Sequence, residues 1–498
     1  MKTYKISSYL RLVTDSETGL VWAYHSLFGN PVIINNEGLR FLNLFRDPID
    51  ELSIAQACDE NPQEAMRDFL MSYFIVESGC DEKAIVRHQH HLHMINVETG
   101  VVADRMGLAI SDACNFGCAH CIHFQPEGEK HVRLQIYQKP HRELLMTFET
   151  AQRCVDHVVA LMRKNNSNLC RIHFGNAEPL INWGVIKQVL EYCDSLDGLK
   201  FEYSINTNLS LLTLEIANIL KKYRVGIATS LDGLEKANDA IRVDMGGKGT
   251  FQLIKSKMDL LDGIAYPLDG FSITVTSKNF ELVDTDIIDF AVERGMKSIA
   301  FDYDLIGLSS IPVGVRVEKL IRLKRYANQL GLEFFGTWDT VFRNLTSVSL
   351  LRHAHAFCAA VQGKSLEFNV DGSMKLCGHT TTDVGRIDRF AENFKSGSGL
   401  LKIVSDRFPG TDDYCTGCEI EGACGGQCHV TREVVQRSVP SEREQLFSDM
   451  CDFYRAITRE LAREEMRMVD VPQKGGDEYG ENQNQGNQDC DAKASDGE

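Results

Sequence analysis

The chain has 498 residues and carries 53 Lys and Arg against 70 Asp and Glu, so its formal net charge is −17. This acidic balance disfavours general nucleic-acid binding, because phosphate contacts need clustered cations. No apolar run reaches the roughly 18 residues that a membrane helix requires, and the first residues lack the apolar centre of a signal peptide. We therefore expect a cytoplasmic protein that binds neither nucleic acid nor a membrane.

Residues 1–100 mix strand-like and helical stretches. Two apolar runs in "GLVWAYHSLFGNPVIINN" flank the turn-forming "SLFGN", which predicts a β-hairpin. The following "NEGLRFLNLF" has helical spacing, with Asn36 as the expected cap. Residues 53–79 predict two short helices and a closing strand. These features indicate a small α+β domain that is winged-helix-like.

Residues 101–340 alternate short apolar strands with amphipathic helices. The predicted strands begin at residues 105, 170, 200, 225, 270 and 298, and each precedes a helical stretch. This alternation predicts an α/β fold, with a parallel sheet covered by helices. Six units fall short of the eight of a closed barrel. We therefore predict a partial (β/α)6 TIM-like barrel whose ligands bind at the carboxyl ends of the strands.

The sixteen cysteines are unevenly distributed. Without a secretion signal, dense cysteines indicate metal ligands or redox groups before disulfides. Cys114, Cys118 and Cys121 follow the first predicted strand with the spacing C-x3-C-x2-C, and seven more lie between Cys358 and Cys451. The other six are interpreted as small buried hydrophobic side chains, and Cys490 is assigned no role: Cys58, Cys80, Cys154, Cys170, Cys193 and Cys490.

The first three thiols are one ligand short of a four-ligand metal site. Thiolate is the preferred ligand of both iron–sulfur clusters and zinc. A zinc site would take His120 or His123 as its fourth ligand, whereas an iron–sulfur cube held by three cysteines would leave one iron open. The spacing alone is compatible with both.

The C-x3-C-x2-C loop after the first strand resembles that of the radical S-adenosylmethionine (radical SAM) enzymes. The resemblance implies a [4Fe–4S] cluster whose open iron binds SAM, which is cleaved to a 5′-deoxyadenosyl radical. Three further stretches resemble the family: "HFGNAEPLIN", "SINTNLSLL" and "SLDGLEKANDAIR". By this resemblance the residues that contact SAM are His120, Glu178, Asn206, Asn208, Ser230 and Arg242.

The match departs from the family pattern at three positions. Asn176 and Ala177 stand where the family has a Gly-Gly pair, and Leu209 stands where Gly is usual. Structural interpretations also exist: Glu178 is favoured by the dipole at a helix start, and Asp232-Gly233 is a frequent turn dipeptide.

The C-terminal cysteines, within residues 341–458, resemble the SPASM domain of radical SAM peptide maturases. The resemblance implies two auxiliary [4Fe–4S] clusters. Cys415, Cys418, Cys424 and Cys451 would bind one, and Cys358, Cys377 and Cys428 the other. The fourth ligand of the second cluster would be His353 or His355, or one iron of that cluster would stay open. His379 is a candidate catalytic base. Paired zinc ribbons are the alternative.

Residues 1–100 resemble the PqqD-like recognition elements that bind a leader peptide by adding it to a sheet edge; the alternative is a capping domain with no peptide role. Residues 459–498 are predicted to be a helix end and a disordered acidic tail.

Together these resemblances imply a radical SAM/SPASM enzyme that modifies a ribosomally synthesised precursor peptide (a RiPP), forming a thioether or C–C crosslink. Its partners would be that peptide with its leader and an external electron donor such as flavodoxin or ferredoxin. An anaerobic sulfatase-maturase-like enzyme is the alternative, although Gly378 stands where those enzymes carry a basic Asp. A non-catalytic Fe–S electron-transfer protein would not bind SAM, and a zinc-binding interaction protein would hold no iron.

Overall fold

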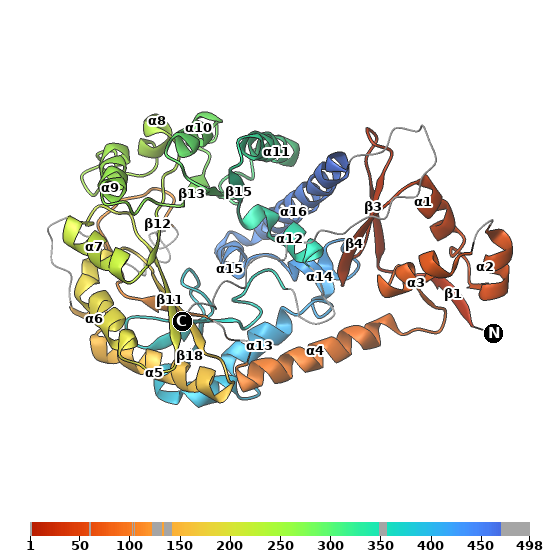
Figure 1. Cartoon of the computed structure of the whole chain (residues 1–498), viewed down its shortest axis with the longest axis horizontal. Coiled ribbons are helices and arrows are strands. Elements are labelled where there is room, and N and C mark those ends of the chain that lie inside the picture. The colour runs from red at the N-terminus through yellow and green to blue at the C-terminus, as the bar shows by residue number, and fades with distance from the viewer. Residues whose placement is uncertain are drawn as a thin grey trace, which may run out of the picture.

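The computed structural model describes residues 2–58, 61–101, 103, 105–121, 142–347 and 356–469, with the backbone of residues 132 and 133. Figure 1 shows the N-terminal unit at one end and the predicted barrel strands at the other. Several positions singled out above lie outside the described residues: His123, His353, His355, Cys490 and the acidic tail from residue 470.

The N-terminal unit holds two antiparallel three-stranded sheets, with the orders β5-β1-β6 and β2-β3-β4. The predicted hairpin is confirmed as β3 and β4. The predicted cap at Asn36 is wrong by one residue, because Asn35 has the extended backbone of a cap and accepts from the amides of Glu37 and Gly38. The elements are β1 (Thr3–Ile6), β2 (Leu10–Thr14), β3 (Val21–His25), β4 (Gly29–Ile34), β5 (Ile49–Asp50), β6 (Ile75–Glu77), α1 (Asn36–Asn43), α2 (Glu51–Ala57) and α3 (Gln63–Met71).

A long helix that the sequence patterns did not reveal, α4 (Glu82–Thr99), runs from the N-terminal unit along the molecule (Figure 1). Asp81 caps its start by accepting from the Ala84 amide at 3.1 Å. The helix ends at Gly100, whose φ of 71° suits a left-handed C-cap.

All six predicted strands of the central region are formed, and their pairings are parallel. An isolated parallel bridge between Ser230 and Ser272 links β12 to β13. The strands are β7 (Arg105–Ala109), β10 (Leu169–Gly175), β11 (Lys200–Asn206), β12 (Gly226–Ala228), β13 (Gly270–Val275), β14 (Ser298–Tyr303) and β15 (Glu333–Phe335), with the short β8 (Ala113–Cys114) and β9 (Val132–Arg133). The helices are η2 (Arg142–Leu144), α5 (Phe148–Lys164), η3 (Pro179–Asn182), α6 (Trp183–Asp194), α7 (Leu214–Lys222), α8 (Glu235–Asp239), α9 (Phe251–Gly263), α10 (Asp286–Glu293), α11 (Val313–Gln329) and η4 (Thr337–Asp339).

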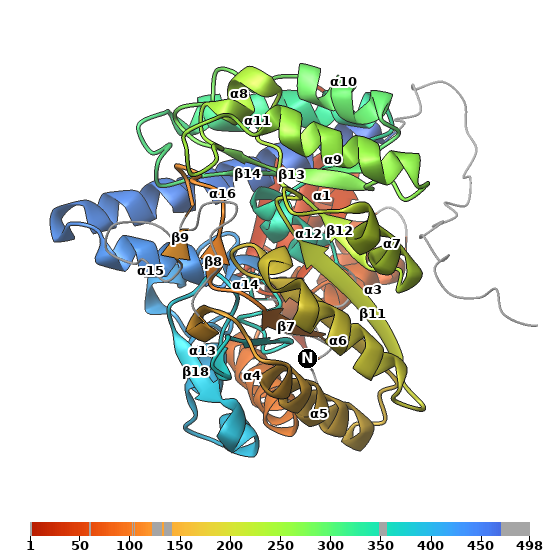
Figure 2. The ribbon, with the colours of Figure 1, turned by 90° about the vertical axis from the view of Figure 1, so that its left-hand side faces the viewer.

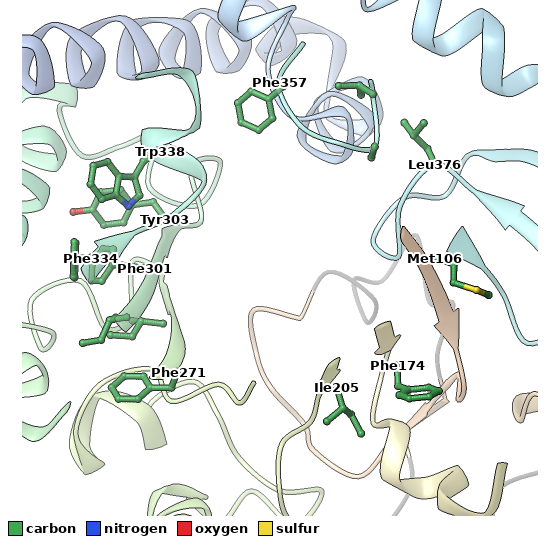
Figure 3. Packing of buried hydrophobic residues seen from close by; sticks show 14 of the residues in the cluster. Met106, Phe174, Ile205, Phe271, Phe301, Tyr303, Phe334, Trp338, Phe357 and Leu376 are labelled. Atoms are coloured by element: carbon green, nitrogen blue, oxygen red, sulfur yellow. The ribbon is translucent and has the colours of Figure 1, made fainter. Parts of the chain in front are cut away.

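The strands bury one face against these helices (Figure 2). Helix α5 begins at the cap Thr147 and buries residues at helical spacing, including Cys154 and Val158. They pack in one core with Met106 and Phe174, which Figure 3 shows on neighbouring strands. Because side chains alternate along a strand, the intervening residues of β7 and β10 point to the opposite, inner face.

The C-terminal region adds strands to the same sheet. β16 pairs in parallel with β7, and β17 and β18 follow in antiparallel order, so the sheet reads β12-β11-β10-β7-β16-β17-β18. The elements are α12 (Thr340–Thr346), β16 (Ser365–Phe368), β17 (Ser373–Lys375), β18 (Asp383–Arg386), η5 (Ile387–Phe394), α13 (Gly399–Asp406), η6 (Asp413–Cys415), α14 (Glu421–Cys424), α15 (His429–Arg437) and α16 (Pro440–Met468).

The N-terminal unit packs directly on this C-terminal region. The Trp22 indole donates to Glu465 on α16 at 3.0 Å and stacks on Phe342 of α12. The Gly422 amide donates to the Ser26 carbonyl at 2.7 Å. A Cβ at position 422 would lie 2.0 Å from the Leu27 carbonyl oxygen, so only glycine allows this approach.

Among the described helices, none combines the length and the apolar character needed to cross a bilayer. Three of the scattered cysteines, Cys154, Cys170 and Cys193, are buried as expected, but Cys58 and Cys80 are only half-buried.

Candidate functional site

Cys114, Cys118 and Cys121 lie beyond the carboxyl end of β7, where the partial-barrel interpretation places ligands. Burial raises the pKa of the Cys114 thiol, and the other two thiols add to the rise, so the three side chains lie close together. Burial also raises the pKa of Cys118. Such thiols ionise only when a cation compensates the thiolate, as a cluster iron would.

Hydrogen-bond donors surround these thiols. The Asn208 side-chain amide lies 3.9 Å from the Cys114 sulfur, and Arg242 Nη1 lies 3.6 Å from the Cys118 sulfur. N–H donors and a guanidinium stabilise anionic sulfur. The residues present therefore fit an anionic, thiolate-held cluster.

A buried ion pair holds the cysteine loop in place. Arg242 Nε donates to Asp232 at 2.8 Å, and Nη2 lies 3.3 Å from His120 Nε2. The backbone adds hydrogen bonds from Gly117 to Val243 at 2.7 Å and from Ala119 to Ile241 at 2.8 Å. We call Arg242, Asp232 and His120 the loop brace.

Asp232 is the member of the loop brace that the sequence analysis missed, because Asp-Gly reads as a turn. The carboxylate is fully buried and accepts from the Thr274 amide at 2.8 Å as well as from Arg242. In the sequence, the signal for this ion pair was the position of Arg242 ten residues after Asp232. Burial lowers the pKa of Arg242, but Asp232 and Cys118 raise it by more, so the guanidinium stays charged.

Glu178 joins two of the predicted SAM stretches. Its fully buried carboxylate accepts from the Leu180 amide at 3.0 Å, the Thr207 hydroxyl at 2.7 Å and the Asn208 amide at 2.7 Å. Burial raises the pKa of Glu178 to about 7. The structure thus brings Glu178 and Asn208 together, and their contact with SAM remains a prediction.

The three residues that stand where the family has glycine all have left-handed backbone conformations. Asn176, Ala177 and Leu209 have φ values of 71°, 38° and 62°. A side chain in this region costs about 1–2 kcal/mol, which glycine avoids. The turns that the family builds from glycine are therefore kept here at a conformational cost.

The remaining predicted SAM contacts lie in different surroundings. Asn206 is exposed at the end of β11, and Ser230 forms the bridge to Ser272. His120 lies in the loop brace, where burial lowers its pKa and Nδ1 has no hydrogen-bond partner among the described residues. Their roles toward SAM stay predictions.

Electrostatic interactions link the C-terminal thiols within each of the two predicted sets, and the binding of clusters by these sets stays a prediction. Burial raises the pKa of Cys415, and the thiols of Cys424, Cys418 and Cys451 contribute to the rise. We call these four the outer set.

The other three thiols, Cys358, Cys377 and Cys428, form the inner set. Burial raises the pKa of Cys377 to about 12, with Cys428 and Cys358 adding to the rise. Within the described residues, no three His, Cys, Asp or Glu side chains converge on one point that could hold a single metal ion. In a [4Fe–4S] cluster each cysteine binds its own iron, so the thiols of a set need not converge on one point, and those of each set lie near enough to affect one another's pKa.

A polar row crosses the inner face of the sheet, and sequence reasoning missed it. Glu367 on β16 pairs with Gly107 on β7, Gly107 with His173 on β10, and His173 with Ser204 on β11. His173 Nδ1 lies 2.9 Å from the Ser204 hydroxyl. A Cβ at position 107 would lie 1.7 Å from the Glu367 carboxylate, so Gly107 makes room for that side chain.

The groups of this row have shifted pKa values. Burial raises the pKa of Glu367 to about 7 and lowers the pKa of His173 to about 4. His379, the predicted base, is exposed and lies near enough to lower the pKa of His173 further. A pocket of about 310 Å³ adjoins this region, lined by Asn176, Lys375 and Gly378 among others. A catalytic role for His379 remains a prediction.

The comparisons with known proteins agree with this geometry. The sequence model of the Radical SAM superfamily matches residues 108–276. The chain is 26% identical over 475 residues to the radical SAM cyclopropyl synthase TigE of Paramaledivibacter caminithermalis, covering 92% of this chain and 96% of the relative. It is 23% identical over 341 residues to a cysteine-type anaerobic sulfatase-maturating enzyme of Clostridium novyi, covering 65% and 87%.

The fold also resembles a solved structure, native anSMEcpe with bound AdoMet. The TM-score is 0.54 at 16% identity, and the match covers 72% of this chain and 99% of that one. At this identity the likeness concerns the fold alone. The thiol loop and its loop brace lie within residues 108–276, the part of the chain that the sequence model of the Radical SAM superfamily matches.

Proposed function

We propose that this chain is a radical SAM enzyme that modifies a ribosomally synthesised precursor peptide. The observation that carries the proposal is the three-thiol loop at the carboxyl end of β7, held by the loop brace and one ligand short of four. A cluster held by Cys114, Cys118 and Cys121 would supply one electron to SAM and yield a 5′-deoxyadenosyl radical. Donors from Asn208 and Arg242 would stabilise the anionic sulfurs.

The same loops provide the SAM site. Glu178 orders the turn after β10 and the turn after β11 against each other. The proposed contacts to SAM come from these turns, from His120, and from Asn206, Ser230 and Arg242. The strained turn at Asn176 and Ala177 supports this assignment, because backbone strain concentrates at binding sites.

Two auxiliary [4Fe–4S] clusters are proposed for the C-terminal region, as in a SPASM domain. The outer set supplies four thiols and the inner set three. The polar row ends at Glu367, which lies near enough to Cys377 to raise the pKa of that thiol. The substrate would therefore meet the inner face between the SAM site and the inner set.

The N-terminal unit is the proposed docking site of the leader peptide. A cavity of about 750 Å³ opens between β1, α2 and α3, and its lining includes Leu52 and Met71. Both side chains are more than half exposed, at 61% and 68%. Exposed apolar groups along a groove suit an amphipathic peptide segment.

For the bond formed, we favour carbon–carbon closure over a thioether. The relative that aligns with nearly the whole chain is named a cyclopropyl synthase, and a cyclopropane requires a new carbon–carbon bond. Sulfatase-type maturation is the second candidate, supported by the relative from Clostridium novyi. Gly378 counts against it, because the position after Cys377 has no side chain to act as a base. We propose a cytoplasmic location and flavodoxin or ferredoxin as electron donor.

The test uses the full chain, reconstituted anaerobically with iron and sulfide. Three cubes require about twelve irons per chain, and addition of SAM with dithionite should yield 5′-deoxyadenosine by mass spectrometry. Replacing Cys114, Cys118 and Cys121 with Ala should remove about four irons and abolish deoxyadenosine. Zinc in place of iron, or iron without cleavage of SAM, would refute the enzymatic proposal.

The peptide assignment has its own test. Peptides translated from small reading frames next to the gene are incubated with the active enzyme, and a loss of two hydrogens is sought by mass spectrometry. Replacing Leu52 and Met71 with Ser should weaken leader binding and leave deoxyadenosine formation without peptide unchanged. Unchanged peptide affinity in that variant would place the leader site elsewhere.

A further inference from the structure

Arg407 is a buried cation between the two C-terminal thiol sets. It follows α13, and its residue is 4% exposed. Its Nε donates to the Gly425 carbonyl at 2.8 Å, Nη2 donates to the Gln427 carbonyl, and Nη1 lies 3.4 Å from His429 Nδ1. All three contacts are to uncharged groups or to a ring that carries charge only when protonated.

No ion pair joins Arg407 to a carboxylate in the described part of the chain, although many other arginines there have one. Burying a charge is costly unless an opposite charge compensates it. Burial lowers the pKa of Arg407, and the nearby Arg432 cation lowers it further; the groups that raise it are thiols, Cys424 of the outer set and Cys428 and Cys358 of the inner set. The counter-charge of Arg407 is therefore to be sought in what these thiols bind.

The loop that Arg407 contacts has the backbone of an anion-binding site. Gly425, Gly426 and Gln427 have φ values of 50°, 81° and 71°. Successive N–H groups in such turns form a concavity that binds anions, including iron–sulfur clusters. The Gln427 amide donates to the Cys424 sulfur at 3.2 Å, and its side-chain amide donates to the Cys451 sulfur at 2.8 Å.

Arg407 and these N–H groups hold one loop, residues 425–427, which joins Cys424 of the outer set to Cys428 of the inner set. The guanidinium donates to the carbonyls of Gly425 and Gln427, and the Gln427 amide donates to the Cys424 sulfur. The side-chain oxygen of Gln427 is buried without a hydrogen-bond partner among the described residues. Leaving this oxygen unpaired costs free energy. The side-chain amide of Gln427 nevertheless keeps its N–H on the Cys451 sulfur, which indicates that this contact with sulfur is favoured.

We propose that Arg407 is a positioning residue and the shared counter-cation of two auxiliary clusters, and that it raises the reduction potential of both. The proposal rests on the two-cluster assignment of the proposed function. A thiolate-held cluster becomes more negative on reduction, so a nearby cation and N–H donors favour the reduced form. One guanidinium placed between both sets acts on each, whereas Gln427 acts on the outer set alone.

The test compares Arg407→Met and Arg407→Lys with the wild-type chain, reconstituted anaerobically. Redox titration followed by EPR gives the potential of each cluster, with signals assigned from variants that lack one cysteine set. In Arg407→Met, the reduction equilibrium of both auxiliary clusters should fall about tenfold, which is 59 mV for a one-electron couple. Arg407→Lys keeps the charge and should lose less. The cluster at Cys114, Cys118 and Cys121 serves as the internal control and should not shift.

Two outcomes would overturn the proposal: unchanged auxiliary potentials in Arg407→Met, or a shift of one auxiliary cluster alone. If Arg407→Met cannot be loaded with iron, Arg407→Gln takes its place, because it removes the charge and keeps a side-chain hydrogen-bond donor; both auxiliary potentials should fall, and the same two outcomes would overturn the proposal. The iron content of the wild-type chain distinguishes a failure of the two-cluster assignment from a failure of the role of Arg407. About four irons per chain would refute the auxiliary clusters themselves, whereas about twelve with unshifted potentials would refute only the role of Arg407.

Discussion

The ion pair of the loop brace offers a quantitative test of what holds the cysteine loop. Asp232 is fully buried, and Arg242 is 8% exposed. Replacing Arg242 with Met leaves the carboxylate with the Thr274 amide at 2.8 Å and with His120 at 3.7 Å. Removal of one partner of a buried pair costs about 3–5 kcal/mol, because the other charge stays buried. Asp232→Asn leaves the guanidinium uncompensated and should cost a similar amount.

The double variant, Asp232→Asn with Arg242→Met, removes both charges and should cost less than either single variant. Urea unfolding of the reduced apoprotein, followed by circular dichroism, gives the four free energies of unfolding of this cycle. Independent sites add to within about 0.5 kcal/mol. Additive losses, or single variants that cost less than about 1 kcal/mol, would contradict the assignment of a coupled buried pair.

Three further predictions follow from the backbone and the inner face. Ala177→Gly should stabilise the apoprotein by about 0.5–1 kcal/mol, because the left-handed turn then no longer strains a side chain; a destabilised variant in urea unfolding would contradict this. Gly422→Ala should loosen the N-terminal unit and speed its proteolytic release, because the new Cβ would meet the Leu27 carbonyl at 2.0 Å, whereas Gly184→Ala, which meets open space, should have no effect. Glu367 has a folded pKa of about 7 against an ordinary value of 4.5, so the unfolded chain loses this proton first and stability falls as pH rises from 4.5 to 7. Glu367→Gln should remove up to about 3 kcal/mol of that fall, measured by apoprotein unfolding at pH 5 and pH 7.5; an equal fall in both proteins would show that the carboxyl is not buried as described.

Local patterns predicted much of this molecule. The six central strands follow from short apolar runs between amphipathic helices, because each strand buries apolar side chains against the helices that connect it to its neighbours. The division of the C-terminal cysteines into an outer and an inner set came from the resemblance to the SPASM domain, and their binding of clusters stays a prediction.

Features that depend on distant partners escaped the sequence analysis. The pairing of β16 with β7 brings Glu367 beside Gly107, and no local pattern encodes that register. Asp232 read as a turn because its partner Arg242 lies beyond the next helix, α8. Helix α4 carries several polar residues and few at regular apolar spacing, so its amphipathic signal is weak.

The pairing of β7 with β16 also determines where the chain can be divided. A fragment that ends at residue 347 would retain every residue that the Radical SAM superfamily model matches, but it would lose β16, which pairs with β7 in the sheet. The backbone N–H and C=O groups on that side of β7 would then be unpaired, as at any exposed edge strand, and such edges recruit strands from other molecules. Truncated forms of this protein are therefore expected to aggregate, and residues 108–276 should be purified and studied only within the longer chain.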